Sequence, residues 1–276
     1  MISYKIVKIG GNMKKGFTLA EGATHAGIFA KKRQVAFTIA EVLITLGIIG
    51  IVAAMTLPSL IGNYKKRETV TILKKAYSEI SQALKMAEVD NEFMEEWNFE
   101  AFENPDERVH HFFYYYLKPY ISTLKVCEPL DVGCMPDKIK QLNGINETQV
   151  AAGKMSFIAK SGYSVLFWIH GDGTGGHFII DTNGPQRQPN TYGKDIFRFI
   201  VTFKNSSKVY ADTVGYSKGL KAFGAVDGVT REELTGGNVT HVGLKPNYGC
   251  KSGLTGFYCA ALIIYDNWEM RNDYPR

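Results

Sequence analysis

The sequence of 276 residues has little net charge of either sign once its first 36 residues are set aside. Its formal charge is +5, but seven of its 32 basic residues and only one of its 27 acidic residues lie within residues 1–36. The remainder therefore holds 25 basic and 26 acidic residues. A chain so balanced does not predict a nucleic-acid-binding surface.

The sequence also lacks the short motifs that mark common enzyme sites. The GxSxG spacing occurs once, as GYSKG at residues 215–219, but in a segment that reads as surface loop and not as the strand-to-helix turn that this motif needs. GDGTGG at residues 171–176 is not followed by the Lys-Ser/Thr of a phosphate-binding loop. His170, Asp172 and His177 are the best alternative for a catalytic or metal cluster. Without a recognisable nucleophile, we predict that the protein is not an enzyme and assign no catalytic residue.

Cysteine is scarce, with Cys127, Cys134, Cys250 and Cys259 as the four examples. Neither local pair has the spacing of a zinc knuckle, which encloses about two to four residues. Three pairings are possible. We predict Cys127–Cys134 and Cys250–Cys259, because each pair is close in sequence and spans Pro or Gly turn residues; unpaired core thiols are the alternative. Disulfides indicate an exported, oxidising location.

Only one hydrophobic run is long enough to cross a bilayer. It extends over residues 37–61, about 37 Å as a helix at roughly 1.5 Å per residue, against a hydrocarbon core of about 30 Å. Three cations at residues 31–33 precede it, and Glu41 is its one carboxylate. Cations before the run predict a cytoplasmic side there. Residues 1–36 read as a leader to be excluded from the fold.

These residues resemble the start of type IV pilins and type II secretion pseudopilins. In that family a basic leader precedes a cleavage point before a Phe, a Glu follows four residues later, and a Pro often lies about twenty residues into an apolar helix. Residues 31–33 match the leader, Phe37 the new N-terminus, Glu41 the carboxylate and Pro58 the proline. The residue before the cut is usually Gly; here Ala36, also small, replaces it.

The resemblance implies a structural subunit of a type IV pilus or type II secretion pseudopilus, with a large head that favours a minor or specialised subunit. A prepilin peptidase would cut after Ala36 and methylate the amine of Phe37. The implied partners are other pilin or pseudopilin subunits, the peptidase, an inner-membrane assembly platform with its motor ATPase, and membrane lipid. The precursor would lie in the inner membrane, and the mature protein in a filament in the periplasm or at the cell surface.

Glu41 has a physical role in this picture. After cleavage, the amine of Phe37 lies one helical turn from its carboxylate. An ammonium and a carboxylate that close offset each other's desolvation, within one chain or between neighbours. In the family, pairing between neighbouring subunits is taken to set the register of the filament. The alternative is an acid near the membrane surface with no such role.

Beyond Pro58 the pattern becomes amphipathic. Apolar residues recur at helical spacing from residue 73 to residue 87, which predicts that one helix continues to about Asp90. We therefore assign residues 37–97 to a pilin-type helix segment, with residues 37–61 in the membrane. Residues 91–106 read as a connection with one short helical turn, and a second helix is expected from Asp106 to about Leu117, after Pro105.

Residues 98–276 are assigned to a globular head outside the membrane. The pattern predicts strands at 155–159, 163–170, 177–181, 196–203 and 208–211, with GDGTGG as a hairpin connection. Residues 215–256 read as surface loop, and residues 258–265 as an edge or closing strand. The expected fold is α+β, a long helix packed on a mostly antiparallel sheet.

The loop at residues 181–195 is the most site-like segment of the head. Asp181, Asn183 and Asp195 carry the hard oxygen ligands that calcium prefers, and some pseudopilins bind calcium in a loop of the head. The loop lacks the alternating acids and final Glu of an EF-hand, so a metal-free Asx-turn loop is the alternative. Apart from this possible calcium ion, no cofactor is predicted.

A second function is kept open. The apolar run could serve as an ordinary signal or anchor, and the head would then be a secreted or membrane-tethered binding module or enzyme. No A-x-A cleavage site is evident after the run. The position of the mature N-terminus separates the two functions.

Overall fold

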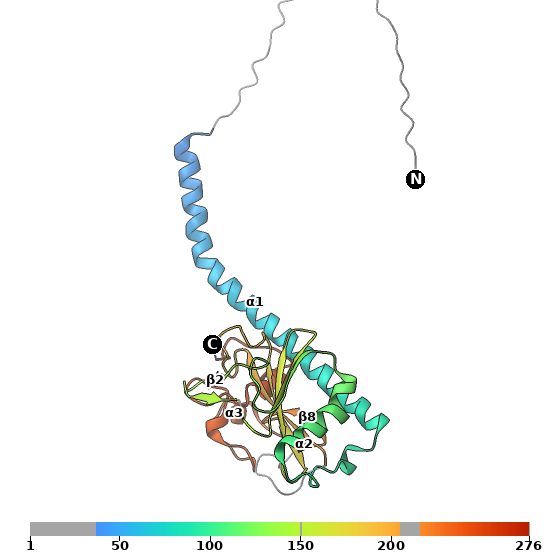
Figure 1. The fold of residues 1–276 in the computed structure, drawn as a ribbon. Helices are drawn as coiled ribbons and strands as arrows, with labels where there is room; N and C mark the ends of the chain where they lie inside the picture. The colour runs from blue at the N-terminus through green and yellow to red at the C-terminus, as the bar shows by residue number, and fades with distance from the viewer. Residues whose placement is uncertain (1–36, 150, 205–215, 276) are drawn as a thin grey trace, which may run out of the picture. The chain divides into compact units, whose positions relative to one another are not determined.

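The structure is a computed structural model that describes residues 37–149, 151–204 and 216–275 (Figure 1). The chain divides after Ala53 into two units. In the first unit, the described residues form the start of helix α1, Ile39–Asp90, and their side chains are almost all exposed. The helix bounds agree with the expected 37–90 to within two residues at the start, and Pro58 does not end the helix.

In the second unit, the later part of α1 buries one apolar stripe. Its buried residues are Val70, Leu73, Ala76, Ile80, Ala83, Leu84 and Ala87. Tyr77, on the same stripe, packs its ring 5.8 Å from that of Phe199. The stripe predicted from the sequence is therefore confirmed, and small Ala residues within it let the helix lie close to the sheet.

The stripe packs on a six-stranded sheet with the order β1-β4-β5-β6-β7-β8, in which every neighbouring pair is antiparallel. This confirms the α+β class. The strands are β1 Thr123–Cys127, β4 Met155–Ala159, β5 Ser164–Ile169, β6 Gly175–Asp181, β7 Ile196–Thr202 and β8 Gly219–Ala222. A separate hairpin pairs β2 Lys138–Lys140 with β3 Asn146–Thr148.

Both faces of the sheet are covered. On one face Phe167 and Phe178 meet Phe112, which follows helix α2, Pro105–His111. On the other face His177 and Arg198 meet Phe223, from the C-terminal part of the chain. Every residue of β6 is consequently buried. A strand covered on both sides reads as a continuous apolar run rather than as an alternation.

The second helix, α2, begins at Pro105, one residue before the expected start, and its α-helical part ends at His111 rather than near Leu117. Asn104 caps it by accepting a hydrogen bond from the backbone N–H of Asp106. The following residues, Phe112–Leu117 (η2), are π-helical, and Lys118–Tyr120 (η3) form a 3₁₀ turn. The expected short turn within residues 91–106 is η1, Met94–Glu96.

The prediction of a closing strand at residues 258–265 is wrong. Cys259–Tyr265 form helix α4, which packs on β7 and β8. The run is apolar because residues 258–263 are all buried, and a run this short has no period that distinguishes helix from strand.

The reading of residues 215–256 as surface loop is also wrong in part. This segment contains β8, helix α3 (Arg231–Leu234) and the turn η4 (Pro246–Tyr248). A capping box between Thr230 and Glu233 begins α3. These elements are too short to give a periodic signal. The expected strand at 208–211 lies outside the described residues, and β1, β2 and β3 were not predicted.

Both predicted disulfides are present. Cys127–Cys134 closes the loop after β1, and Cys250–Cys259 joins the start of α4 to the segment that precedes it. No cysteine is left free within the part of the chain that the structure describes.

We expect Leu73→Ala to lower the free energy of unfolding by about 2–5 kcal/mol, because Leu73 is fully buried between α1 and the sheet. The measurement is urea unfolding of the full chain in mild detergent, followed by tryptophan fluorescence.

The matched control is Leu124→Ala on β1, where the side chain is 67% exposed and the change should stay within about 0.5 kcal/mol. Equal effects of the two substitutions would show that the stripe does not hold the head to the helix.

Candidate functional site

The predicted processing and assembly residues lie at the start of α1. Ala36 is outside the described residues, and Phe37 is 78% exposed. The Glu41 carboxylate accepts hydrogen bonds from the backbone N–H and the hydroxyl of Thr38, both at 2.8 Å. The Glu41 N–H in turn donates to the Thr38 hydroxyl at 3.2 Å. Thr38 and Glu41 thus form a reciprocal capping box.

Thr38 was missed as a partner of Glu41, although the Thr-x-x-Glu spacing is readable in the sequence. The box satisfies donors that a helix start leaves unpaired. It also holds the carboxylate at the N-terminal end of α1, where the helix dipole favours a negative charge. Glu41 therefore has a defined position before any second chain is considered.

The predicted loop residues Asp181, Asn183 and Asp195 come together at one end of β6 and β7. Asp181 Oδ1 accepts from the backbone N–H groups of Asn183 and Gly184, at 3.0 and 3.1 Å. The Asn183 side-chain amide donates to Asp195 Oδ2 at 3.1 Å. The two β-strands thus place both carboxylates in a single turn cluster.

Asp195 organises the returning half of the loop. Its Oδ2 accepts from the N–H of Asn190 at 2.8 Å, and its Oδ1 accepts from the N–H of Thr191 at 2.7 Å. Asn190 has a positive φ of 50°, a conformation that Asn tolerates better than most residues. These bonds are those of the metal-free Asx loop that the sequence left as the alternative.

Three oxygens of the cluster nevertheless remain without a hydrogen-bond partner within the described part of the chain. They are Asp181 Oδ2, Asn183 Oδ1 and Asn190 Oδ1, and all three are buried. Carboxylate and amide oxygens of this kind suit calcium. The donor chemistry therefore fits the predicted ion, which remains a proposal.

The pKa of Asp181 is raised to about 7, chiefly by burial and in part by the nearby charge of Asp195, against the lowering effect of the Asn183 and Gly184 N–H groups. Burial likewise raises the pKa of Asp195. Two ionised carboxylates buried in one turn repel each other and lose their hydration. The free-energy cost is lower when at least one carboxyl group keeps a proton, or when a cation lies between them.

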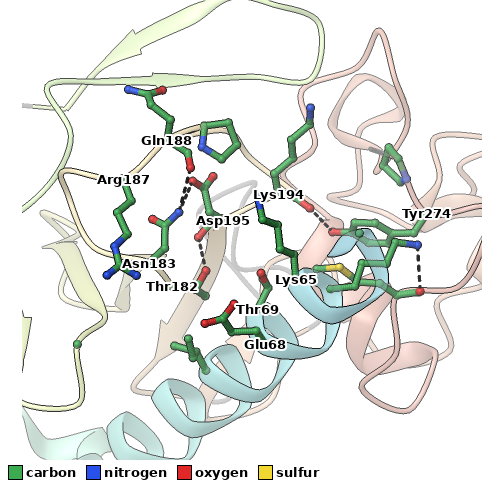
Figure 2. Close-up of a pocket in the computed structure, with 18 of the residues that line it drawn as sticks. Lys65, Glu68, Thr69, Thr182, Asn183, Arg187, Gln188, Lys194, Asp195 and Tyr274 are labelled. Carbon is green, nitrogen blue, oxygen red and sulfur yellow. Dashed lines mark hydrogen bonds between the residues drawn. The ribbon is translucent and has the colours of Figure 1, made fainter. Parts of the chain in front are cut away.

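The same loop forms one wall of a pocket of about 740 Å³ (Figure 2). Residues 62–72 of α1 form the second wall, and the C-terminal Met270, Tyr274 and Pro275 form the third. The buried Tyr274 hydroxyl donates to the Gly193 carbonyl at 2.8 Å and so ties the C-terminal segment to the loop. Lys66 donates to the Arg271 carbonyl at 3.1 Å and ties α1 to the same segment.

The pocket lining is rich in cations. Lys65 and Lys66 come from α1, and Arg187 and Lys194 from the loop, against the acids Glu68 and Asp195. Figure 2 shows Lys65 and Arg187 on two sides of the pair formed by Asn183 and Asp195. Sequence reasoning missed this convergence, because more than a hundred residues separate Lys65 from Arg187.

The His170, Asp172 and His177 cluster is partly assembled. The two imidazole rings lie 5.0 Å apart, but Asp172 Oδ1 accepts from the backbone N–H and hydroxyl of Thr174 within its own turn. His177 is buried against Trp168, with the Arg198 guanidinium 3.3 Å from its Nε2. Burial, and then the Arg198 charge, lower the pKa of His177 well below its usual value.

The raised pKa of Asp181 predicts a pH dependence of stability. Between about pH 4 and pH 7 the folded chain keeps a proton that the unfolded chain releases, so the free energy of unfolding should fall as the pH rises through this window. The loss should reach up to about 4 kcal/mol at about 1.4 kcal/mol per pH unit, and should level off above about pH 7.

Asp181→Asn keeps the acceptor oxygen and cannot ionise, so it should flatten this profile and stabilise the protein at pH 7. Asp137→Asn, at an exposed position, serves as the control and should leave the profile unchanged. An unaltered slope in the Asp181→Asn variant would contradict the assignment.

Calcium should raise the thermal midpoint of the full chain relative to chelator, and by more at pH 8 than at pH 5, because protons compete for Asp181. Asp181→Asn should abolish the effect. Equal midpoints with calcium and with chelator at both pH values would remove calcium from the loop.

A family of proteins matches most of the chain. A family described as "Family of unknown function (DUF6613)" matches residues 59–276, which begin just after Pro58 and include the later part of α1 and the whole head. No curated protein and no solved structure matches the chain. Since the match covers most of the sequence, the chain belongs to the family of unknown function DUF6613.

Proposed function

We propose that the protein is a structural subunit, minor or specialised, of a type IV pilus or type II secretion pseudopilus. The observation that carries the proposal is Glu41, a carboxylate held by Thr38 at the start of an exposed apolar helix. The leader of basic residues and Phe37 directly precede this arrangement in the sequence.

The exposed apolar surface of the first part of α1 indicates that lipid or other protein chains cover this part of the helix. The large apolar side chains from Ile39 to Ile61 are mostly half exposed or more, and α1 is long and apolar enough to cross a membrane by length and composition. A soluble chain rarely leaves so large an apolar surface in water. Lipid covers it in the precursor, and neighbouring helices cover it in a filament.

Glu41 would determine how neighbouring helices pair in the filament. Its partners within the described residues belong to Thr38, one turn away. A charge in an apolar surrounding costs several kcal/mol unless it is paired. Trimming after Ala36 would create an ammonium on Phe37, and this group on an adjacent subunit would supply the pairing that Thr38 alone does not.

The head has the features of an exported domain. Its two disulfides indicate an oxidising compartment, and the near balance of its charges fits a solvated surface rather than a polyanion partner. Inner-membrane insertion of the precursor and later transfer to a filament follow from the proposal. The peptidase, assembly platform and motor ATPase are its required partners.

The mature N-terminus tests processing. When the chain is expressed with a prepilin peptidase, mass spectrometry should find a terminus at Phe37, N-methylated. A terminus at Met1 or Met13 in such cells, or one beyond Ala54, would support the alternative of an ordinary anchor or signal.

Assembly is tested by Glu41→Val, which should leave membrane insertion intact and lower incorporation into filaments by at least tenfold. Thr45→Val, the same product residue one turn further along the apolar segment, is the matched control and should assemble normally. Normal filaments from the Glu41→Val variant would count decisively against the pairing.

A further inference from the structure

The pocket lies on α1 just beyond the end of the apolar run. The apolar run ends at Ile61, and Lys65 follows four residues later in the same helix. This separation corresponds to a rise of about 6 Å. The headgroup layer adds about 5–7 Å to the hydrocarbon core on each side of a bilayer. Lys65 therefore reaches the depth of lipid headgroups when the run lies in a membrane.

The neighbouring residues of the helix fit this depth. Tyr64 is 67% exposed, and aromatic rings of this type gather where hydrocarbon meets headgroups. Leu57 and Leu60, just before it, are exposed apolar residues. The pocket thus opens next to the point where the chain leaves the apolar phase.

The charged groups of the pocket are arranged for an anion. No ion pair joins Lys65, Arg187 or Lys194 to an acid in the described parts of the chain. Asp195, the buried acid of the lining, already accepts hydrogen bonds from Asn183, Asn190 and Thr191. Its oxygens are therefore turned toward the loop's own donors, and the cations of the lining outnumber the acids four to two.

The pocket also has apolar walls. Ile72, Pro189, Met270 and Pro275 line it beside the cations. A volume of about 740 Å³ lies within the range of small-molecule sites, about 300–1,000 Å³. An amphiphile with a phosphate and a glycerol backbone matches such a lining better than a bare inorganic ion does.

We propose that this pocket binds the phosphate headgroup of an anionic phospholipid, with Lys65 and Arg187 as the principal cations. Lys66 holds the C-terminal wall in place through its bonds to backbone carbonyls, and Lys194 adds charge at the rim. The site would seat the head on the membrane surface. The inference rests on membrane insertion of α1 and not on filament assembly, so each can fail without the other.

The test uses the full chain in mild detergent, in buffer with chelator, and native mass spectrometry to measure retained lipid. Phosphatidylglycerol should bind at least tenfold more tightly than phosphatidylcholine. The Lys65→Gln, Arg187→Gln double variant should lose at least tenfold in affinity for phosphatidylglycerol, since each cation near an anionic headgroup contributes about fivefold. Both side chains are exposed, so the unfolding midpoint should not change.

The matched control is an Arg67→Gln, Lys138→Gln double variant. Arg67 lies on α1 beside Lys66 but does not line the pocket, and Lys138 is exposed on β2. It loses the same total charge and should bind phosphatidylglycerol within about twofold of the unaltered chain. Equal losses in the two double variants would show general surface attraction and overturn the pocket.

A competition experiment with a soluble phosphate tests whether the pocket binds a lipid headgroup or a free phosphate compound. Glycerol phosphate at millimolar concentration should displace phosphatidylglycerol only weakly, because it lacks the acyl chains held by the apolar phase. Displacement at equal concentrations would make a soluble phosphate the occupant and overturn the lipid assignment. Equal retention of phosphatidylglycerol and phosphatidylcholine would overturn the proposal altogether.

Discussion

The burial of one stripe of α1 against the antiparallel sheet is the interaction on which the rest of the structure depends. A single helix of 52 residues carries an exposed apolar start and a buried stripe. Because the stripe packs on the sheet, the head is attached to the helix that also supplies the apolar segment. Without this packing, the end of the apolar run would have no fixed position relative to the pocket within the second unit.

Covering the second face of the sheet creates the pocket wall. The C-terminal part of the chain lies over β7 and β8 through α4, and Tyr274 then bonds to Gly193 in the loop between β6 and β7. Ties from Glu79 to Ser161 and Tyr163, both at 2.8 Å, hold α1 to the turn between β4 and β5. The lining residues are therefore positioned by helix, sheet and C-terminus together. A change in any of the three should alter the site.

Periodicity predicted those parts of the fold in which one face is buried or a run is long. Residues 73–87 of α1 repeat at helical spacing, and β4 was predicted at its observed bounds. Residues 259–265 were assigned to the wrong class because a short segment with five consecutive buried residues, 259–263, shows no period. Strands such as β2 and β8, of three and four residues, are determined by their tertiary neighbours and leave no local signal.

The same contrast holds for the site. Asp181, Asn183 and Asp195 were predicted together because they are close in sequence, and their convergence is a local property of one loop. Lys65 and Arg187 line the same pocket only because the helix docks on the sheet, so no spacing in the sequence could reveal them. Thr38 was readable from its spacing to Glu41 but needed the helix start to be placed first.

The central claim is that α1 is one continuous helix whose two parts are protected by different surroundings, lipid for the first and the sheet for the second. Hydrogen–deuterium exchange of the full chain in lipid nanodiscs tests it most directly. The account predicts slow exchange from residue 39 to residue 61, and exchange over residues 70–87 as slow as in β5 and β6. Fast exchange over residues 70–87, with β5 and β6 still protected, would contradict it.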